Sequence, residues 1–129
     1  MHITNTTNTR KYKRDNILSH LLVSETATGA KHLTTSLVEM EIDGRQHVHA
    51  HETEQAYFII EGKGMMQVND EQREVGKGDS IFIPSNAKHG LINTGSGKLV
   101  YLSAGSPPFG SKRELALWPL TGSDFDGEK

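Results

Sequence analysis

Three of the chain's seven histidines, His47, His49 and His51, stand at alternate positions within five residues. Side chains of a β-strand alternate between its two faces, so a strand over this stretch would place all three imidazoles on one face. Imidazoles that converge in this way can bind a transition metal ion. A solvated His-rich strand is the alternative interpretation, and the choice between the two depends on what the rest of the chain brings to the same place.

Composition restricts the chemistry further. The chain has no cysteine, which excludes disulfides, zinc–thiolate sites and a thiol nucleophile, so a metal would have to be held by imidazole, carboxylate or amide groups. Its 14 Lys and Arg nearly balance its 16 Asp and Glu, and no long block of one charge occurs. This balance argues against nucleic acid or an anionic membrane as a partner. No signal peptide and no apolar run of about 18 residues are found, so we expect a cytoplasmic protein without a membrane span.

The elements that must position the histidines are short apolar segments separated by Gly, Asn and Asp turns. Short strands separated by turns at spacings of about ten residues are typical of an antiparallel sandwich or barrel. Almost no segment shows a helical pattern. The predicted strands cover residues 17–23, 33–42, 47–51, 56–61, 65–68, 72–75, 80–83, 89–93 and 99–104.

The segments outside these strands are polar. We expect residues 1–15 to form an N-terminal arm, mobile or laid on a partner subunit, residues 16–120 to form one domain, and residues 121–129 to fray. Ser111 and Glu114 match a capping box, which would start one or two helical turns within the domain's last segment.

A second cluster lies about 35 residues beyond the first, and the two together resemble the paired motifs of the cupin superfamily. In the second motif Gly78, Pro84, His89 and Asn93 have the family's identity and spacing, while Asn86 stands where the family has Gly. Asn tolerates a left-handed backbone, so this replacement is mild. The resemblance implies an all-β double-stranded β-helix, the jelly-roll or cupin barrel, over the predicted domain.

The first motif can be aligned with the family pattern in two registers. The preferred register keeps the spacing to Gly62 and implies that the metal ligands are His49, His51, Gln55 and His89, with Gln55 in place of the family's Glu. In the alternative register the spacing to Gly62 is one residue too long, and the ligands are His47, His49, Glu54 and His89. In the preferred register His47 is left over, as a candidate either for the pocket wall or for a solvent-facing position at the rim. Tyr57 shares the parity of Gln55 and is a candidate either for the pocket or for core packing.

The resemblance implies one divalent transition metal per chain, which could be Fe, Mn, Ni, Zn or Cu. Three imidazoles and an amide oxygen are all neutral, so the ion would keep its charge and attract an anionic or carbonyl-bearing small molecule. Similarity to dioxygenase-like and uronate-processing cupins implies a metalloenzyme of the oxygenase type. The alternatives are a non-redox isomerase or lyase on a sugar acid or other carbonyl compound, which Glu39 or Glu41 could serve if they face inward, and a non-catalytic sugar-binding module. Family members that pair their sheets suggest a homodimer.

Overall fold

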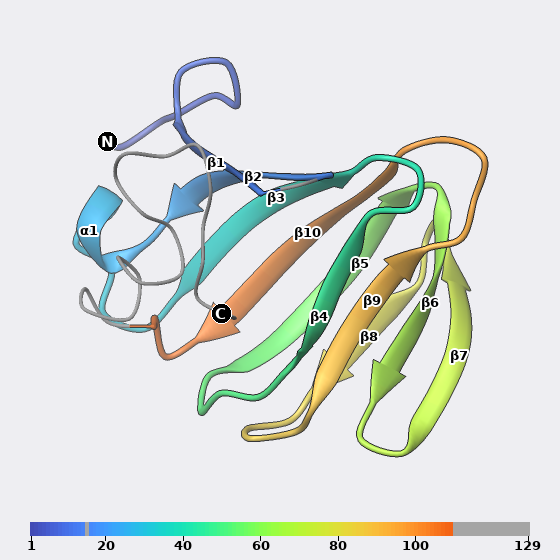
Figure 1. Ribbon diagram of the computed structural model, residues 1–129. Coiled ribbons are helices and arrows are strands. Elements are labelled where there is room, and N and C mark those ends of the chain that lie inside the picture. The colour runs from blue at the N-terminus through green and yellow to red at the C-terminus, as the bar shows by residue number, and fades with distance from the viewer. Residues whose placement is uncertain (15, 110–129) are drawn as a thin grey trace.

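The computed structural model describes residues 1–14 and 16–109, in which ten strands form two antiparallel sheets (Figure 1). The strands are β1 (Arg10–Arg14), β2 (Ile17–Val23), β3 (Thr34–Met40), β4 (Arg45–His49), β5 (Glu54–Glu61), β6 (Lys63–Val68), β7 (Glu71–Gly76), β8 (Ser80–Ile83), β9 (His89–Asn93) and β10 (Leu99–Ser106). Three of them, β2, β8 and β9, have the boundaries that the sequence predicts.

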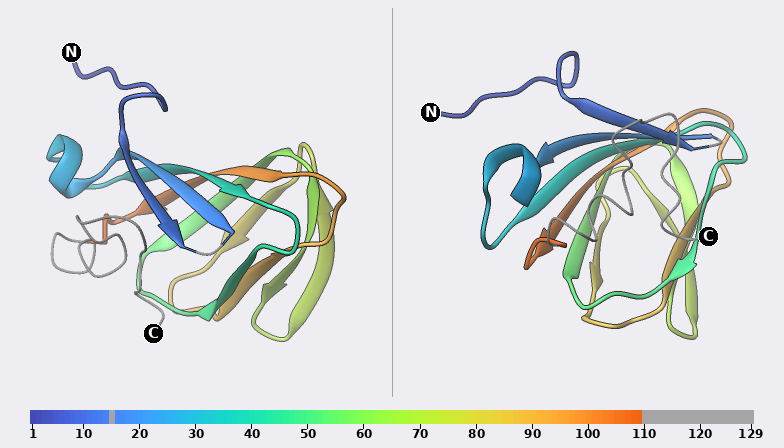
Figure 2. Two further views of the ribbon diagram at one scale, coloured as in Figure 1. Left: turned by 45° about the horizontal axis from the view of Figure 1, so that its top comes forward. Right: turned by 60° about the vertical axis from the view of Figure 1, so that its left-hand side comes forward.

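One sheet has six strands in the order β1-β2-β3-β10-β5-β8, and the other has four in the order β4-β9-β6-β7. The two sheets face each other as the layers of a sandwich (Figure 2). The predicted jelly-roll is therefore confirmed. Among the described residues the two sheets stay separate ladders and do not close into one hydrogen-bonded barrel, so β7 and β8 each form a sheet edge.

Period-two alternation decides which side chains enter the space between the sheets. In β3 and β10 every second residue is buried, as expected for strands with one face on a core. The core consists of large apolar side chains from both sheets, among them Met40, Ile59, Ile83, Leu91 and Leu99, each with no exposed surface.

The one helix of the described residues is α1 (Glu25–Thr28), a single turn between β2 and β3. Ser24 caps its N-terminus by accepting a hydrogen bond from the Ala27 amide, and Gly29, with φ of 74°, ends it in the left-handed region. No helix within residues 1–14 and 16–109 has the length and apolar character needed to cross a membrane.

The N-terminal segment contains a strand, β1, within the stretch that the sequence predicts to be an arm. Residues 10–14 form β1, which pairs with β2 along its whole length, so the part of the arm outside the sheets is residues 1–9. Tyr12 is the reason: its side chain is 1% exposed, while its neighbours in this Arg- and Lys-rich strand give no apolar pattern. The predicted tail at 121–129 and the capping box at Ser111 and Glu114 lie outside the described residues.

Candidate metal centre

His49, His51 and His89 come together between the sheets, and each offers a ring nitrogen within 4.8 Å of the other two. His49 ends β4, His51 lies in the loop before β5, and His89 begins β9, directly paired with His49. The ring centroids are 4.3 Å apart for His49 and His89, 4.7 Å for His51 and His89, and 5.3 Å for His49 and His51. His51 and His89 are buried and His49 is half-buried, so this is an interior cluster.

Each of these rings is held by a backbone carbonyl. The Nδ1 atoms of His49, His51 and His89 lie 2.8, 2.9 and 2.9 Å from the carbonyl oxygens of His47, Thr53 and Ala87 respectively. A carbonyl can only accept, so Nδ1 must carry the proton and, in a neutral ring, Nε2 carries the lone pair. Metal-binding histidines are commonly oriented by such a contact on the second nitrogen. The three rings are therefore fixed in the tautomer that a metal requires.

His89 is the most enclosed of the three. Its pKa is lowered to about 4, mainly by burial; the hydrogen bond to the Ala87 carbonyl opposes this shift, and the neighbouring imidazoles of His49 and His51 add to it. Its Nε2 is buried and has no hydrogen-bond partner among the described residues. A neutral imidazole with an enclosed, unused lone pair fits a metal ligand, because an unsatisfied buried acceptor is otherwise costly.

Gln55 has the same kind of unused acceptor. It is 8% exposed, and its Nε2 donates to the Ser103 hydroxyl at 2.9 Å, which fixes the orientation of the amide. Its Oε1 is buried and has no partner within the described part of the chain. Glu54, one residue earlier in β5, has the opposite parity and is exposed. Of the two fourth ligands that the motif registers name, Gln55 is the one whose side chain points into the molecule.

His47 does not join the cluster, contrary to the expectation that all three alternate histidines share one face. Gln46 pairs with Leu91 and His49 pairs with His89, so β4 has two residues, His47 and Val48, opposite the single Gly90. This is a β-bulge, which reverses the alternation of side chains beyond it. His47 is exposed as a result, while its carbonyl oxygen is the one that holds His49.

Tyr57 lies inside the sandwich, 1% exposed, with its ring centroid 6.3 Å from that of His89 and 4.6 Å from that of Tyr101. Its hydroxyl donates to Gln46 Oε1 at 3.1 Å. Burial raises its pKa to about 12, so the phenol stays protonated at neutral pH. Tyr57 therefore both packs in the core and contributes to the surroundings of His89.

Gln46 and Ser103 are the contacts that sequence analysis missed. Neither is one of the residues that define a motif. Each accepts a hydrogen bond from a candidate residue on another strand: Gln46 from Tyr57, and Ser103 from Gln55. The pairing of Ser103 with Tyr57 across β10 and β5 depends on a strand order that the sequence does not display.

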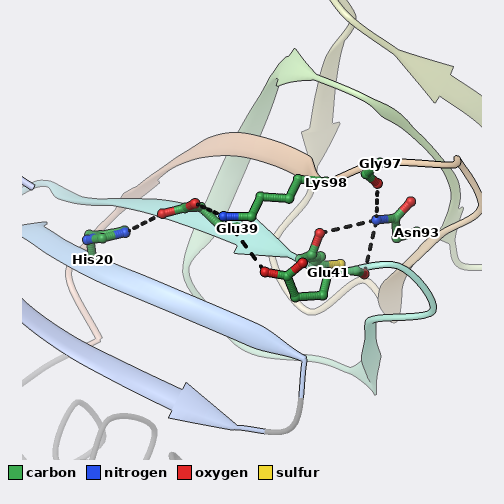
Figure 3. Close-up of polar contacts among 7 residues, drawn as sticks. His20, Glu39, Glu41, Asn93, Gly97 and Lys98 are labelled. Carbon is green, nitrogen blue, oxygen red and sulfur yellow. Dashed lines mark hydrogen bonds and ion pairs between the residues drawn. The ribbon is translucent and has the colours of Figure 1, made fainter.

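Glu39 and Glu41 are not part of the histidine cluster. They lie instead with His20 and Lys98 (Figure 3). Glu39 Oε2 is 2.6 Å from His20 Nε2, and its other oxygen is 3.1 Å from Lys98 Nζ, which also lies 3.7 Å from Glu41. The hydrogen bond with His20 is the main cause that lowers the pKa of Glu39. These carboxylates belong to a network with His20 and Lys98 and do not supply an acid or base beside the three histidines.

The remaining motif residues have structural roles. Asn93 Nδ2 donates to the carbonyl oxygens of Met40, Glu41 and Gly97 at 2.9 to 3.1 Å, which ties β9 to the end of β3 and to the turn before β10 (Figure 3). Asn86 has φ of 65°, so the position where Asn replaces the motif glycine does adopt the left-handed backbone.

The motifs, the two sheets and the interior histidines agree with the comparison against protein families, in which the model described as "Cupin domain" matches residues 36–105. The chain belongs to the cupin family. A relative from Methanocaldococcus jannaschii, named only as an uncharacterized protein, is 33% identical over 98 residues, which cover 75% of this chain and 78% of the relative.

Solved structures share this cupin's fold at lower identity. A predicted oxalate decarboxylase from Thermotoga maritima has a TM-score of 0.73 and 19% identity, with 81% of this chain and 98% of that one covered. The polyketide cyclase RemF from Streptomyces resistomycificus has a TM-score of 0.71 and 24% identity, with 84% and 82% covered. At these identities the likeness establishes the cupin fold alone.

Proposed function

We propose that this cupin is a mononuclear metalloenzyme of the oxygenase type that acts on a small oxygenated organic molecule. The observation that carries the proposal is the tautomeric arrangement of His49, His51 and His89, in which three carbonyls hold Nδ1 and leave Nε2 as the ligating atom. A histidine with a purely structural role would not need two further imidazoles beside it that are oriented in the same way. A divalent transition metal bound there would supply Lewis acidity and, if redox-active, electron transfer.

Gln55 is the fourth ligand in this proposal, through the buried Oε1 that the hydrogen bond from its Nε2 to the Ser103 hydroxyl leaves available. Three imidazoles and an amide are all neutral donors, so the ion would retain its charge. The site would then favour a substrate with an anionic or carbonyl oxygen. Around it, Tyr57 and Gln46 would exclude water and present a protonated phenol whose hydrogen is already directed to Gln46 Oε1.

The metal found in purified protein, combined with oxygen uptake, tests this function. Iron or copper bound at one ion per chain, with oxygen consumed in the presence of a substrate, is the expected result. Zinc or nickel with turnover but without oxygen uptake would instead support a non-redox isomerase or lyase. That alternative shares the Lewis-acid site, and the names of the two structural neighbours, a predicted decarboxylase and a cyclase, agree with it. A protein without any bound transition metal would contradict both.

Replacing Gln55 by Ala is expected to weaken metal binding about tenfold, because one of four ligands is removed. The matched variant, Glu54→Ala, alters the adjacent, exposed carboxylate and should leave the affinity unchanged. Competition with a chromophoric chelator measures both values. A larger loss in Glu54→Ala would favour the other motif register.

We also propose a homodimer that buries the outer face of the six-stranded sheet. Phe58, Ile60 and Phe82 are 48%, 41% and 61% exposed there, and the strand pairing places them on one face beside Leu102. An apolar group of this size on a sheet face is a common feature of subunit contacts.

Light scattering should therefore give twice the chain mass of 14.2 kDa. Phe58→Glu is expected to shift the protein to the monomer. Ile42→Glu, at a residue that is 50% exposed in the turn after β3, should not. A monomeric wild-type protein at micromolar concentration would contradict the proposed contact.

A further inference from the structure

A cavity of about 460 Å³ lies where the sandwich is open, between the edge strands β7 and β8. Its lining includes Met66 and Val68 of β6, Arg73 and Val75 of β7, and Ile81 of β8. This volume falls within the range of small-molecule sites. The two sheets have no shared ladder here, so a ligand can enter without breaking backbone hydrogen bonds.

The inner wall of the cavity is apolar and adjoins the metal centre. Met66 and Val75 are buried core residues, and Val68 and Ile81 pack against the same core. Val68 is the direct strand partner of His89, and Ile81 is the direct partner of Tyr57. Paired residues of antiparallel strands present their side chains on the same face, so the apolar wall leads toward His89.

Arg73 supplies the positive charge of the cavity. It pairs with the buried Met66, on the side of the four-stranded sheet that faces the cavity, but Arg73 itself is exposed at the rim, and it makes no ion pair within the described residues. Of the acidic residues of the lining, Glu74 pairs with Met65 and has the opposite parity, and Asp79 accepts a hydrogen bond from the Gly76 amide at 2.7 Å. Arg73 is thus the cation available to a ligand.

Glu71 is the negative charge on the same face. The pairing of Glu71 with Val68, and of Val68 with His89, puts all three in one row across β7, β6 and β9. Two strand spacings separate Glu71 from His89, roughly 10 Å between their backbones. A second carboxylate on a ligand anchored at Arg73 would meet this side chain.

We propose that this cavity binds a linear monocarboxylate, with its carboxylate on Arg73 and its alkyl chain over Met66, Val68, Val75 and Ile81. Planar guanidinium groups recognise carboxylates through paired hydrogen bonds. Glu71 selects against dicarboxylates by repulsion of like charge. Binding here does not require a metal at the histidines, so it can be tested on metal-free protein and its outcome is separate from that of the metal analysis.

Calorimetric titration of metal-free protein with octanoate, suberate and octylamine tests the charge preference. Octanoate should bind more tightly than suberate, which has the same chain length and two carboxylates, and more tightly than octylamine. Arg73→Gln should weaken octanoate binding about fivefold, the scale of a partly exposed ion pair. Arg45→Gln is the matched control, an exposed arginine on β4 at the far edge of the same sheet, and should change nothing.

Glu71→Gln should raise the affinity for suberate toward that for octanoate. Methyl resonances of Val68 and Ile81, which face the cavity, should shift on octanoate addition. Such shifts distinguish binding in this cavity from binding on the apolar outer face of the six-stranded sheet. Octanoate that does not bind, octylamine that binds as tightly, equal affinities for Arg73→Gln and wild type, or unshifted methyl resonances would each overturn the assignment.

Discussion

Replacing His89 by Ala is expected to lower the affinity for a divalent transition metal by more than about 100-fold, the largest functional effect that the structure predicts. His89 is the candidate ligand with no exposed surface, its ring lies next to both other imidazoles, and its Nε2 has no hydrogen-bond partner among the described residues. Loss of this ring removes one donor and opens the space that it fills. Equilibrium dialysis with zinc, and circular dichroism of the metal-free variant to establish that it is folded, provide the measurement.

The matched control is His47→Ala. Its imidazole is exposed on the outer side of the bulge, and the carbonyl that it gives to His49 survives the substitution. We expect wild-type metal affinity. If His47→Ala lost as much affinity as His89→Ala, the ligand set with Gln55 would be wrong and the bulge would have to be absent in solution.

Gly62→Ala is expected to lower the free energy of unfolding by about 3 kcal/mol or more, the largest effect on stability. Gly62 has φ of 86°, and an added Cβ would clash with the Lys98 carbonyl oxygen. That oxygen belongs to the backbone just before β10 and cannot turn away as a side chain can. Urea denaturation of metal-free protein followed by circular dichroism measures the loss.

Gly78→Ala isolates the backbone contribution. Gly78 has φ of 90° but an added Cβ would meet nothing within 4 Å, so only conformational strain remains, about 1 kcal/mol. Equal losses at the two glycines would contradict the role given to the Lys98 contact. Gly62, the final glycine of the first motif, and Gly78, the first glycine of the second, thus share a left-handed backbone conformation, but only Gly62 is crowded by neighbouring atoms.

Local patterns were sufficient to predict most strands, because segments such as Ile17–Val23 and Ser80–Ile83 combine apolar residues with clear turn signals at both ends. They failed at β1, a basic strand in which Tyr12 is the sole buried residue. Nothing in the order of residues reveals that a neighbouring strand will complete such a segment.

The candidate site was predictable where it depends on spacing and not where it depends on pairing. His49, His51 and His89 follow from the resemblance of the two motifs, and the structure brings these three together. The outward position of His47 arises from the register of β4 against β9, which is a property of two segments about 40 residues apart. The contacts from Gln46 to Tyr57 and from Ser103 to Gln55 are hidden for the same reason.

The position of β10 has a consequence for how the chain reaches its native state. This strand is the last of the ten in sequence, yet it lies in the middle of the six-stranded sheet, between β3 and β5. During synthesis β3 and β5 therefore lack their common partner until residue 106 has left the ribosome, and one edge of each strand has no hydrogen-bonded neighbour until then. Pairing between such distant segments slows folding and lengthens exposure to aggregation. A nascent chain stalled before Leu99 should remain open to proteases, and protection should appear in one step when β10 is released.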